Sequence, residues 1–521
     1  MKPDTQTIEI PHASIQELRQ RGELPTTKEA LAIELTMRVG ELLVSAGAGA
    51  QDTVVMMRRI CQTYGLSRAQ IDITHTVILV SYYPGDGLPP FTSMRSVAAS
   101  EPNLSKVYAV NDLVNQICSG MSVSRASKRF DRIRKAAPPY PGWLAGLAGG
   151  GISMSVQLFY TTSPKILILA LITGYLVNRF VYLLSRTGLP VLFRQMFGAW
   201  LIVAIAAGVT WLNAHPSLAF LGYISPTTLA VGCIFQLVAG ARFVAGIQDA
   251  IDGFYVTASA RILQVVMLTA GLVTGLVTGL DLARTLGIDV LISSDAPVVQ
   301  GVTAQFVAAV ATAVLWAVSC LGNLRTVAVT AVVALVGWTV RWSVVEAGAG
   351  LVVGSFAGPM VAGLVTVFIV RRWSQLPSFG IINGVGMPFV PGLTLYLGLI
   401  QWVGSNTANP DPSKGGTTLG MAAAIALAIS AGASLGAFLG RPASERLMQL
   451  PVPWIARSRR SAGPVTPAGG KLKHVSGRGT LLQPAAVGGE GEAVPDDNDS
   501  GAPGQTDPDT AARRLPGQQG T

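Results

Sequence analysis

Long runs of residues without Asp, Glu, Lys or Arg limit what this chain can fold into. A membrane-spanning helix needs about 20 mostly apolar residues, so an uncharged apolar run of that length indicates a crossing. Such runs include residues 143–164, 195–241, 296–324, 347–370, 373–410 and 415–440. Only 13% of the 521 residues are charged, whereas soluble domains carry roughly 25%. The chain is therefore predicted to be an integral membrane protein.

About ten crossings of standard helix length account for the apolar region. They are predicted at residues 142–161, 165–184, 196–213, 220–239, 257–280, 299–321, 325–342, 347–370, 379–401 and 417–440. Arg and Lys gather at the connections that this count places on one side, as the positive-inside rule expects of the cytoplasm. Both termini are thus expected in the cytoplasm. The net charge of +10 then requires no nucleic-acid partner.

A repeated segment relates the two halves of the apolar region. Residues 224–250 align without gaps with residues 376–402, and Gly240 falls on Gly392. Both segments are apolar and are interrupted by Gly or Pro near the same point, which is the best sequence indicator of a transporter binding site. Five predicted crossings separate equivalent helices, and five is an odd number. The two halves are therefore predicted to insert in opposite directions, as inverted repeats do.

The region before the first crossing has the pattern of a small folded domain. Helices are predicted at about 27–46, 52–64, 108–118 and 122–135, and one strand at 71–80 that contains His75. The first 25 residues are polar and hold no apolar core of a signal peptide. The tail is rich in Gly, Pro, Ser and Asp and has too few large apolar residues to form a core.

The predicted fold is therefore an all-α polytopic membrane protein with about ten transmembrane helices in two inverted five-helix repeats, preceded by a small cytoplasmic α+β domain. Its parts are a flexible N-terminus (1–27), the cytoplasmic domain (28–138), the first transmembrane half (139–282), the second transmembrane half (296–440) and a disordered tail (456–521). The four cysteines form no metal-ligand pattern, so neither a metal nor another cofactor is expected.

The interrupted segments carry the candidate substrate-binding residues. An amino acid is a zwitterion, and half-helices with unwound backbone offer N–H groups to its carboxylate and carbonyls to its ammonium. Gly240 and Gly392 would let the substrate approach the backbone, and Pro388 and Pro391 remove helix hydrogen bonds. The alternative for the glycines is close helix packing. Asn383 either binds substrate or forms a hydrogen bond across helices.

Two acidic residues that follow the first interruption are the candidates for proton coupling. Asp249 and Asp252 lie where the chain re-enters the membrane, and acidic groups there are costly and usually functional. The alternative places both in a cytoplasmic loop, paired with Arg242 or Arg261. His75 is expected to be structural.

This arrangement resembles the bacterial threonine/serine exporter family over roughly residues 28–440. The resemblance rests on the small-residue turn at 45–49, on residues 237–240 and 389–392, which are similar to the Val-Pro-Gly elements of the family, and on residues 247–251. Ala239 stands where Pro is expected, and the Arg that many relatives carry after the turn is missing. The resemblance implies secondary export of threonine and serine across the inner membrane, driven by the membrane potential or the proton gradient.

Two other functions stay open at this point. The same fold would suit export of another small amino acid or metabolite, because Thr, Ser and Ala differ by only one or two small groups. A membrane-anchored sensor or enzyme would instead have its activity in residues 28–135, although Ser45, Ser81 and His75 form no readable catalytic triad. The partners expected of an exporter are the small-molecule substrate, protons and the lipid bilayer.

Overall fold

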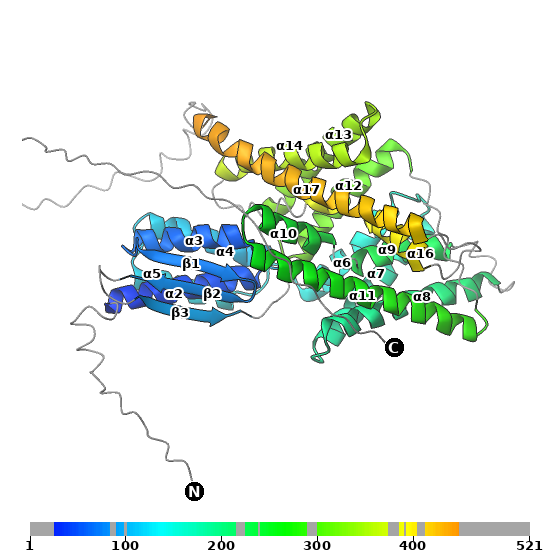
Figure 1. The fold of residues 1–521 in the computed structure, drawn as a ribbon, viewed down its shortest axis with the longest axis horizontal. Helices are drawn as coiled ribbons and strands as arrows, with labels where there is room; N and C mark the ends of the chain where they lie inside the picture. Colours follow the sequence, from blue (N-terminus) through cyan, green and yellow to red (C-terminus); the bar gives the residue numbers. More distant parts are fainter. Residues whose placement is uncertain are drawn as a thin grey trace, which may run out of the picture. The chain divides into compact units, whose positions relative to one another are not determined.

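The computed structural model describes the nine segments that contain the regular structure (Figure 1). These are residues 26–83, 90–97, 102–214, 225–237, 240–288, 300–372, 385–389, 392–403 and 412–447. All of them belong to one compact unit, residues 1–451. The predicted flexible N-terminus up to residue 25 and the predicted tail at 456–521 lie outside the described residues.

The N-terminal region combines four helices with a three-stranded sheet. Its elements are α2 (Thr27–Ser45), α3 (Ala50–Thr63), β1 (Ala69–Thr74), β2 (Val77–Tyr82), β3 (Phe91–Ser96), α4 (Leu104–Cys118) and α5 (Val123–Lys135). The strands pair antiparallel in the order β1-β2-β3. Helix α2 begins at a capping box, in which Thr26 and Glu29 satisfy each other's backbone N–H groups. Buried side chains such as Met37, Met57 and Ile78 join α2 and α3 to the sheet.

The prediction of one strand at 71–80 is wrong, because the structure forms a hairpin there. Strands β1 and β2 pair from Ala69↔Tyr82 to Thr74↔Val77. His75 occupies the turn with a φ of 48°, a left-handed conformation that few residues other than Gly adopt. The alternation of polar and apolar residues continues through this turn without a Gly or Pro. No local signal therefore marked the reversal.

Helices make up the rest of the described chain. They are α6 (Gly142–Gln157), α7 (Pro164–Ser185), α8 (Val191–Ala214), α9 (Pro226–Leu237), α10 (Gly240–Ile251), α11 (Tyr255–Thr285), α12 (Val302–Ser319), α13 (Leu324–Glu346), α14 (Leu351–Arg372), the 3-10 turn η2 (Met387–Phe389), α16 (Gly392–Val403) and α17 (Pro412–Leu447).

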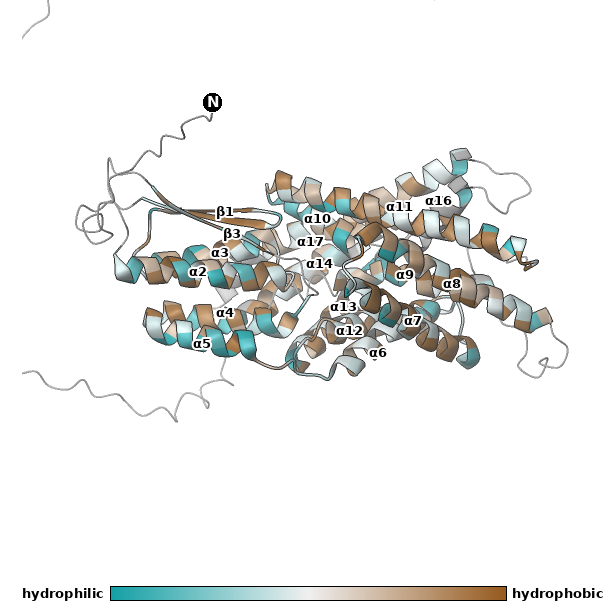
Figure 2. Cartoon of the chain, turned by 90° about the horizontal axis from the view of Figure 1, so that it is seen from below, coloured by the Kyte–Doolittle hydropathy of each residue, from teal (hydrophilic) through white to brown (hydrophobic). Residues whose placement is uncertain are grey.

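Seven of these helices are long and apolar enough to cross a membrane: α7, α8, α11, α12, α13, α14 and α17. The bent pair α9 and α10 raises the number to eight if it is counted as one span. Figure 2 shows the contrast in hydropathy between α7 or α8, which are mostly hydrophobic, and the hydrophilic α5. The prediction of a multi-pass membrane protein is confirmed. Ten crossings remain a prediction, because α6 has 16 residues and α16 has 12.

The two halves repeat the same helix packing. Helix α8 packs on α11 in the first half, and α14 packs on α17 in the second. In the same way α6 packs on α7 and α9, as α12 does on α13 and η2, while α10 packs on α11 as α16 does on α17. The pairs occupy equivalent places in the order of helices along each half. This agreement is independent of the short sequence repeat.

Glycines spaced four residues apart bring the main helix pair of each half into backbone contact. They are Gly271, Gly275 and Gly279 in α11, and Gly432, Gly436 and Gly440 in α17. A Cβ at Gly275 would overlap the carbonyl of Met196 in α8, and a Cβ at Gly436 would overlap the carbonyl of Met360 in α14. Small residues at this spacing are the usual means by which membrane helices approach closely.

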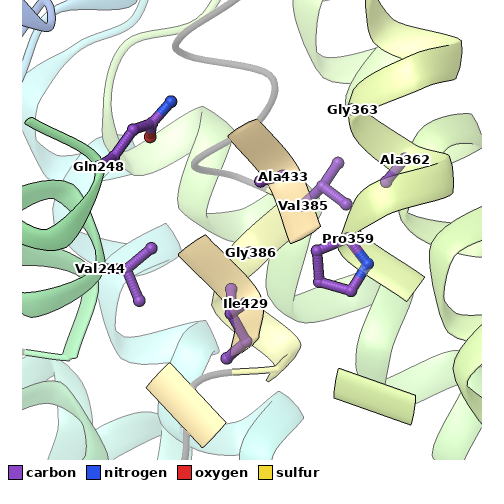
Figure 3. A pocket seen from close by; sticks show the side chains of 9 residues that line it. All are labelled: Val244, Gln248, Pro359, Ala362, Gly363, Val385, Gly386, Ile429 and Ala433. Atoms are coloured by element: carbon purple, nitrogen blue, oxygen red, sulfur yellow. The ribbon is translucent and has the colours of Figure 1, made fainter. Parts of the chain in front are cut away.

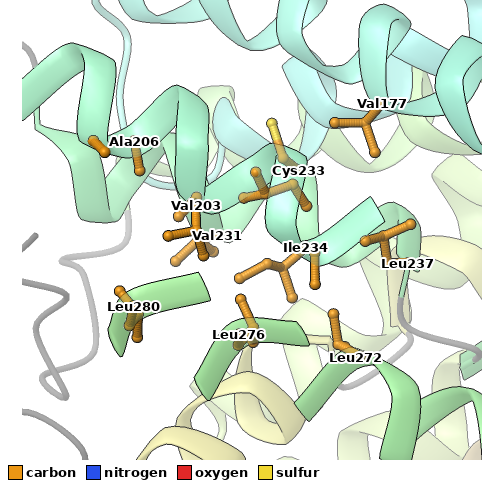
Figure 4. Packing of buried hydrophobic residues seen from close by; sticks show 14 of the residues in the cluster. Val177, Val203, Ala206, Val231, Cys233, Ile234, Leu237, Leu272, Leu276 and Leu280 are labelled. Carbon is orange, nitrogen blue, oxygen red and sulfur yellow. The ribbon is translucent and has the colours of Figure 1, made fainter. Parts of the chain in front are cut away.

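Two apolar cores lie among the membrane helices. The first is built by α7, α8, α9 and α11, with residues such as Val203, Ile234 and Leu276 at its centre (Figure 4). The second contains Val333 of α13, Ala362 of α14 and Ile429 of α17. Both cores also take residues from the interrupted segments, and this sharing defines the candidate site.

Candidate substrate site at the two helix breaks

The helix ends at equivalent points in the two repeated segments. Helix α9 ends at Leu237 and α10 begins at Gly240, while η2 ends at Phe389 and α16 begins at Gly392. Helices α10 and α16 each have 12 residues, so both the start and the length of the second piece repeat. The axes of α9 and α10 differ by 41°. The bend between α9 and α10 agrees with an interruption of the first segment, while residues 238–239 and 390–391, where the breaks are predicted, lie outside the described residues.

The two helical pieces of each interrupted segment pack in different apolar cores. Ile234 of α9 and Leu397 of α16 belong to the first core, although they come from different halves of the chain. Val244 of α10 and Phe389 of η2 belong to the second core. Each interrupted segment therefore connects one core to the other, and the four pieces meet as two pairs.

A small pocket of about 10 Å³, roughly the room of one water molecule, lies where α10 meets the segment before η2. Figure 3 shows its lining, with Val244 and Gln248 on α10 facing Pro359 of α14 and Val385 before η2. The remaining lining residues are Ala362, Gly363, Gly386, Ile429 and Ala433. Gln248 supplies the polar side chain of this otherwise apolar lining. Concave apolar sites with few polar groups are typical of small-molecule binding.

The predicted substrate-binding residues that the structure describes are Gly240, Pro388 and Gly392, and each has a different position relative to the pocket. Gly240 starts α10, and Pro388 in η2 is half-buried two positions after the cavity residue Gly386. Gly392 is buried, and a Cβ there would overlap the ring of Phe235 in α9. The packing alternative therefore describes the contact that Gly392 makes. Asn383 and Pro391 lie outside the described residues.

Asp249 lies at the end of α10 and joins three parts of the chain. Its carboxylate is buried and forms an ion pair with Arg261 of α11, with 2.7 Å between Oδ2 and the guanidinium nitrogen. It also accepts a hydrogen bond from the backbone N–H of Ala50, the first residue of α3. Of the two predicted partners, Arg261 is the one that the structure pairs with Asp249. Asp252 is exposed in the turn that follows α10.

The N-terminal region contacts the connection between α10 and α11 at further points. The backbone N–H of His75 donates to Oγ1 of Thr257 at 3.0 Å, and that hydroxyl donates to the carbonyl of Ile73 at 3.0 Å. Phe254 packs against the apolar core formed by α2, α3 and the sheet. A further contact joins Leu104 N–H of α4 to the carbonyl of Cys320 at 2.9 Å. The N-terminal region thus holds the end of α10.

Gln248 is the site residue that sequence reasoning missed. It is adjacent to Asp249, and successive residues on a helix point about 100° apart. Gln248 therefore faces the cavity while Asp249 faces Ala50 and Arg261. The sequence signal that could have identified Gln248 is its position as an uncharged polar residue soon after the first predicted break. Only the packing of α10 against α17 and α11 shows which neighbour faces the pocket.

Apolar spans, repeated helix packing, an interrupted segment in each half and a cavity between them define a polytopic membrane protein of the transporter class. Comparison with known families agrees with this class. Residues 34–283 match the family described as threonine/serine exporter, and residues 301–438 match the family described as Threonine/Serine exporter, ThrE. The chain belongs to the threonine/serine exporter family, whose named members are transporters rather than enzymes.

Two curated relatives span most of the chain. A Mycobacterium tuberculosis (strain ATCC 25618 / H37Rv) protein named "Probable threonine/serine exporter" is 31% identical over 434 residues, 81% of this chain and 79% of the relative. The "Threonine/serine exporter" of Corynebacterium glutamicum is 27% identical over 413 residues, 78% of this chain and 82% of the relative. No solved structure matches the chain. The expected family is thereby confirmed.

Proposed function

We propose that this protein is a secondary exporter of threonine and serine across the bacterial inner membrane. The observation that carries the proposal is the cavity at the meeting point of the two interrupted segments, in a chain that belongs to the threonine/serine exporter family. The relatives named for this activity match 81% and 78% of this chain. The pocket places the Gln248 side chain among apolar residues where α10 meets the segment before η2, with room for about one water molecule.

In this proposal, alternating access arises because the two pieces of each interrupted segment belong to different cores. Helices α9 and α16 move with one core and α10 and η2 with the other, so a rotation between the cores bends both interrupted segments together. In this proposal the two halves insert in opposite directions and the termini are cytoplasmic. Support comes from the contacts of the N-terminal region, which fall on the α10–α11 and α12–α13 connections. Arginines in the adjoining helices flank both connections, Arg242 and Arg261 at the first and Arg325 at the second, as expected of the cytoplasmic side.

Proton coupling is assigned to Asp249 in this proposal. A proton on its carboxylate would remove the charge that pairs with Arg261 and weaken the bond from Ala50. Helix α10, which lines the cavity through Val244 and Gln248, would then be released from the N-terminal region. The titrating group is thus placed on the same helix as the cavity lining. Asp252, exposed in the following turn, has the smaller role.

The test is efflux of labelled threonine and serine from preloaded proteoliposomes that contain the full chain, with and without an uncoupler. Ala433→Leu would fill the cavity and is expected to abolish efflux. Gly420→Leu is the control on the same helix, because a Cβ at exposed Gly420 meets nothing within 4 Å. Uncoupler-sensitive efflux that Ala433→Leu alone removes supports the proposal. Efflux of a different small amino acid would keep the cavity and change the substrate.

A further inference from the structure

One cation lies within a membrane helix beside the candidate site. Arg341 is half-buried in α13, five positions before the end of that helix, and it packs on α14. A Cβ at Gly358 would lie 3.1 Å from the Cβ of Arg341, and Gly358 is followed directly by the cavity residue Pro359. The guanidinium-bearing residue and the cavity are therefore neighbours along α14.

Aromatic rings surround this cation. The guanidinium carbon of Arg341 lies 4.4 Å from the centre of the Trp338 ring. Trp338 in turn contacts Phe389 of η2, at 5.5 Å between ring centres, and Phe159, which follows α6, at 5.3 Å. Phe389 is the last residue before the break in the second repeat. The aromatic cluster thus connects Arg341 to the interrupted segment itself.

Two buried donors in this cluster have no acceptor among the described residues. They are Nε of Arg341 and Nε1 of Trp338. Both groups can only donate hydrogen bonds. Ionisable residues within a membrane helix are costly, and they usually mark a substrate pathway. Two unmatched donors on an aromatic surface require a ligand that accepts hydrogen bonds and carries negative charge.

We infer that Arg341 and Trp338 form a binding site for the α-carboxylate of the transported amino acid, on the outward side of the cavity. Arginine binds carboxylates through a planar fork of N–H groups. The inference rests on the proposed function and adds the group by which the substrate is held as it leaves. On the proposed topology α13 runs outward, so Arg341 lies between the cavity and the external solution.

The test compares threonine with its amide, in which a neutral group replaces the carboxylate. Counterflow of labelled threonine into proteoliposomes of the full chain is measured with either compound as external competitor. Threonine is expected to compete about tenfold or more better than the amide in the wild-type protein, as the loss of one charged hydrogen-bonding contact predicts. Equal competition by the two compounds would overturn the assignment without any variant.

Variants separate the carboxylate site from a structural role. Arg341→Gln is expected to raise the half-saturating external threonine concentration about tenfold or more and to remove the preference over the amide. Arg341→Lys keeps the charge without the fork and should be intermediate, and Trp338→Phe keeps the ring without the donor. Arg325→Gln, at the exposed opposite end of α13, is the control. Wild-type preference retained in Arg341→Gln would assign this cation to lipid headgroups or packing instead.

The outcome is distinguishable from failure of the proposed function. If the wild-type protein moves another small amino acid and not threonine, the substrate assignment fails, and the same comparison is made with that amino acid and its amide. If threonine is transported but its amide competes equally, the exporter stands and the carboxylate site at Arg341 falls.

Discussion

Asp249 of α10 and Arg261 of α11 form a buried ion pair with a separation of 2.7 Å. The pair closes the turn between the second piece of the first interrupted segment and the long helix that follows it. Ala50 of α3 donates its backbone N–H to the same carboxylate, and Gly49 at the N-cap provides no side chain for that role. The carboxylate from α10 thus caps a helix of the N-terminal region.

Replacement of Asp249 tests this junction and the coupling proposal together. Asp249→Asn keeps the shape but leaves the Arg261 charge unpaired, which is expected to cost about 3 kcal/mol of stability. Efflux should lose its dependence on the pH gradient. Thermal unfolding of the purified protein and efflux at two external pH values measure these effects. Asp281→Asn, at an exposed acid near the end of α11, is the control. Retained pH-gradient dependence would make Asp249 purely structural.

Gly392 is predicted to admit no side chain. Gly392→Leu would drive a side chain into the ring of Phe235 and separate α16 from α9. Membrane insertion should be normal and threonine efflux abolished, because helix hydropathy is preserved while the pairing of the two interrupted segments is lost. Phe235→Ala in the same chain should restore part of the efflux. Normal efflux by Gly392→Leu alone would exclude the close approach from the mechanism.

The glycine spacing predicts matched stability effects in the two halves. Gly275→Leu and Gly436→Leu would each force apart a helix pair that is in backbone contact. Each is expected to destabilise the purified protein by about 1–3 kcal/mol or more, as overpacking does. Gly208→Leu in α8, where a Cβ meets nothing within 4 Å, should have little effect. A melting temperature as high as the wild type in both variants would contradict the packing described here.

His75 predicts a stability loss at acidic pH. Burial, and then the charge of Arg261, lower the pKa of His75 below its ordinary value of 6.5, while Asp249 partly opposes the shift. Because the unfolded chain binds this proton more readily, the stabilising contribution is fully present above pH 6.5 and is lost as pH falls through the lowered pKa. His75→Asn tolerates the left-handed turn and does not titrate.

The measurement is the melting temperature of the purified protein at pH 7.5 and at pH 5.5, wild type against His75→Asn. The wild type should lose more stability on acidification than the variant, since only the wild type must protonate a half-buried imidazole beside Arg261. Equal losses in the two proteins would assign the pH response to other groups.

Sequence patterns predicted the parts of this protein that depend on local chemistry. The uncharged runs predicted the apolar spans, since a helix in lipid must present apolar side chains along its whole length. The helix expected from about residue 27 is found as α2, and the structure adds that Thr26 and Glu29 form a capping box at its start. The hairpin at His75 was not predicted, because the alternation passes through a turn that has neither Gly nor Pro.

The parts of the candidate site that could be predicted are those that depend on the local backbone chemistry of Gly and Pro. Gly240 and Gly392 stand first in the described helices α10 and α16, and the breaks before them stay a prediction, because residues 238–239 and 390–391 lie outside the described residues. Gln248 and Arg341 were not predicted as site residues. Their roles depend on which helix each faces, and α10, α13 and α14 meet across sequence separations that no local periodicity encodes.

The sequence by itself determined the apolar spans and the family, because hydropathy and short motifs are properties of local segments. Only the tertiary structure decided that α9 joins α16 in one core while α10 joins η2 in the other. It also turned Gln248 to the cavity and Asp249 to Arg261. Those choices follow from close packing between distant segments, where shape complementarity of whole helices decides which faces meet.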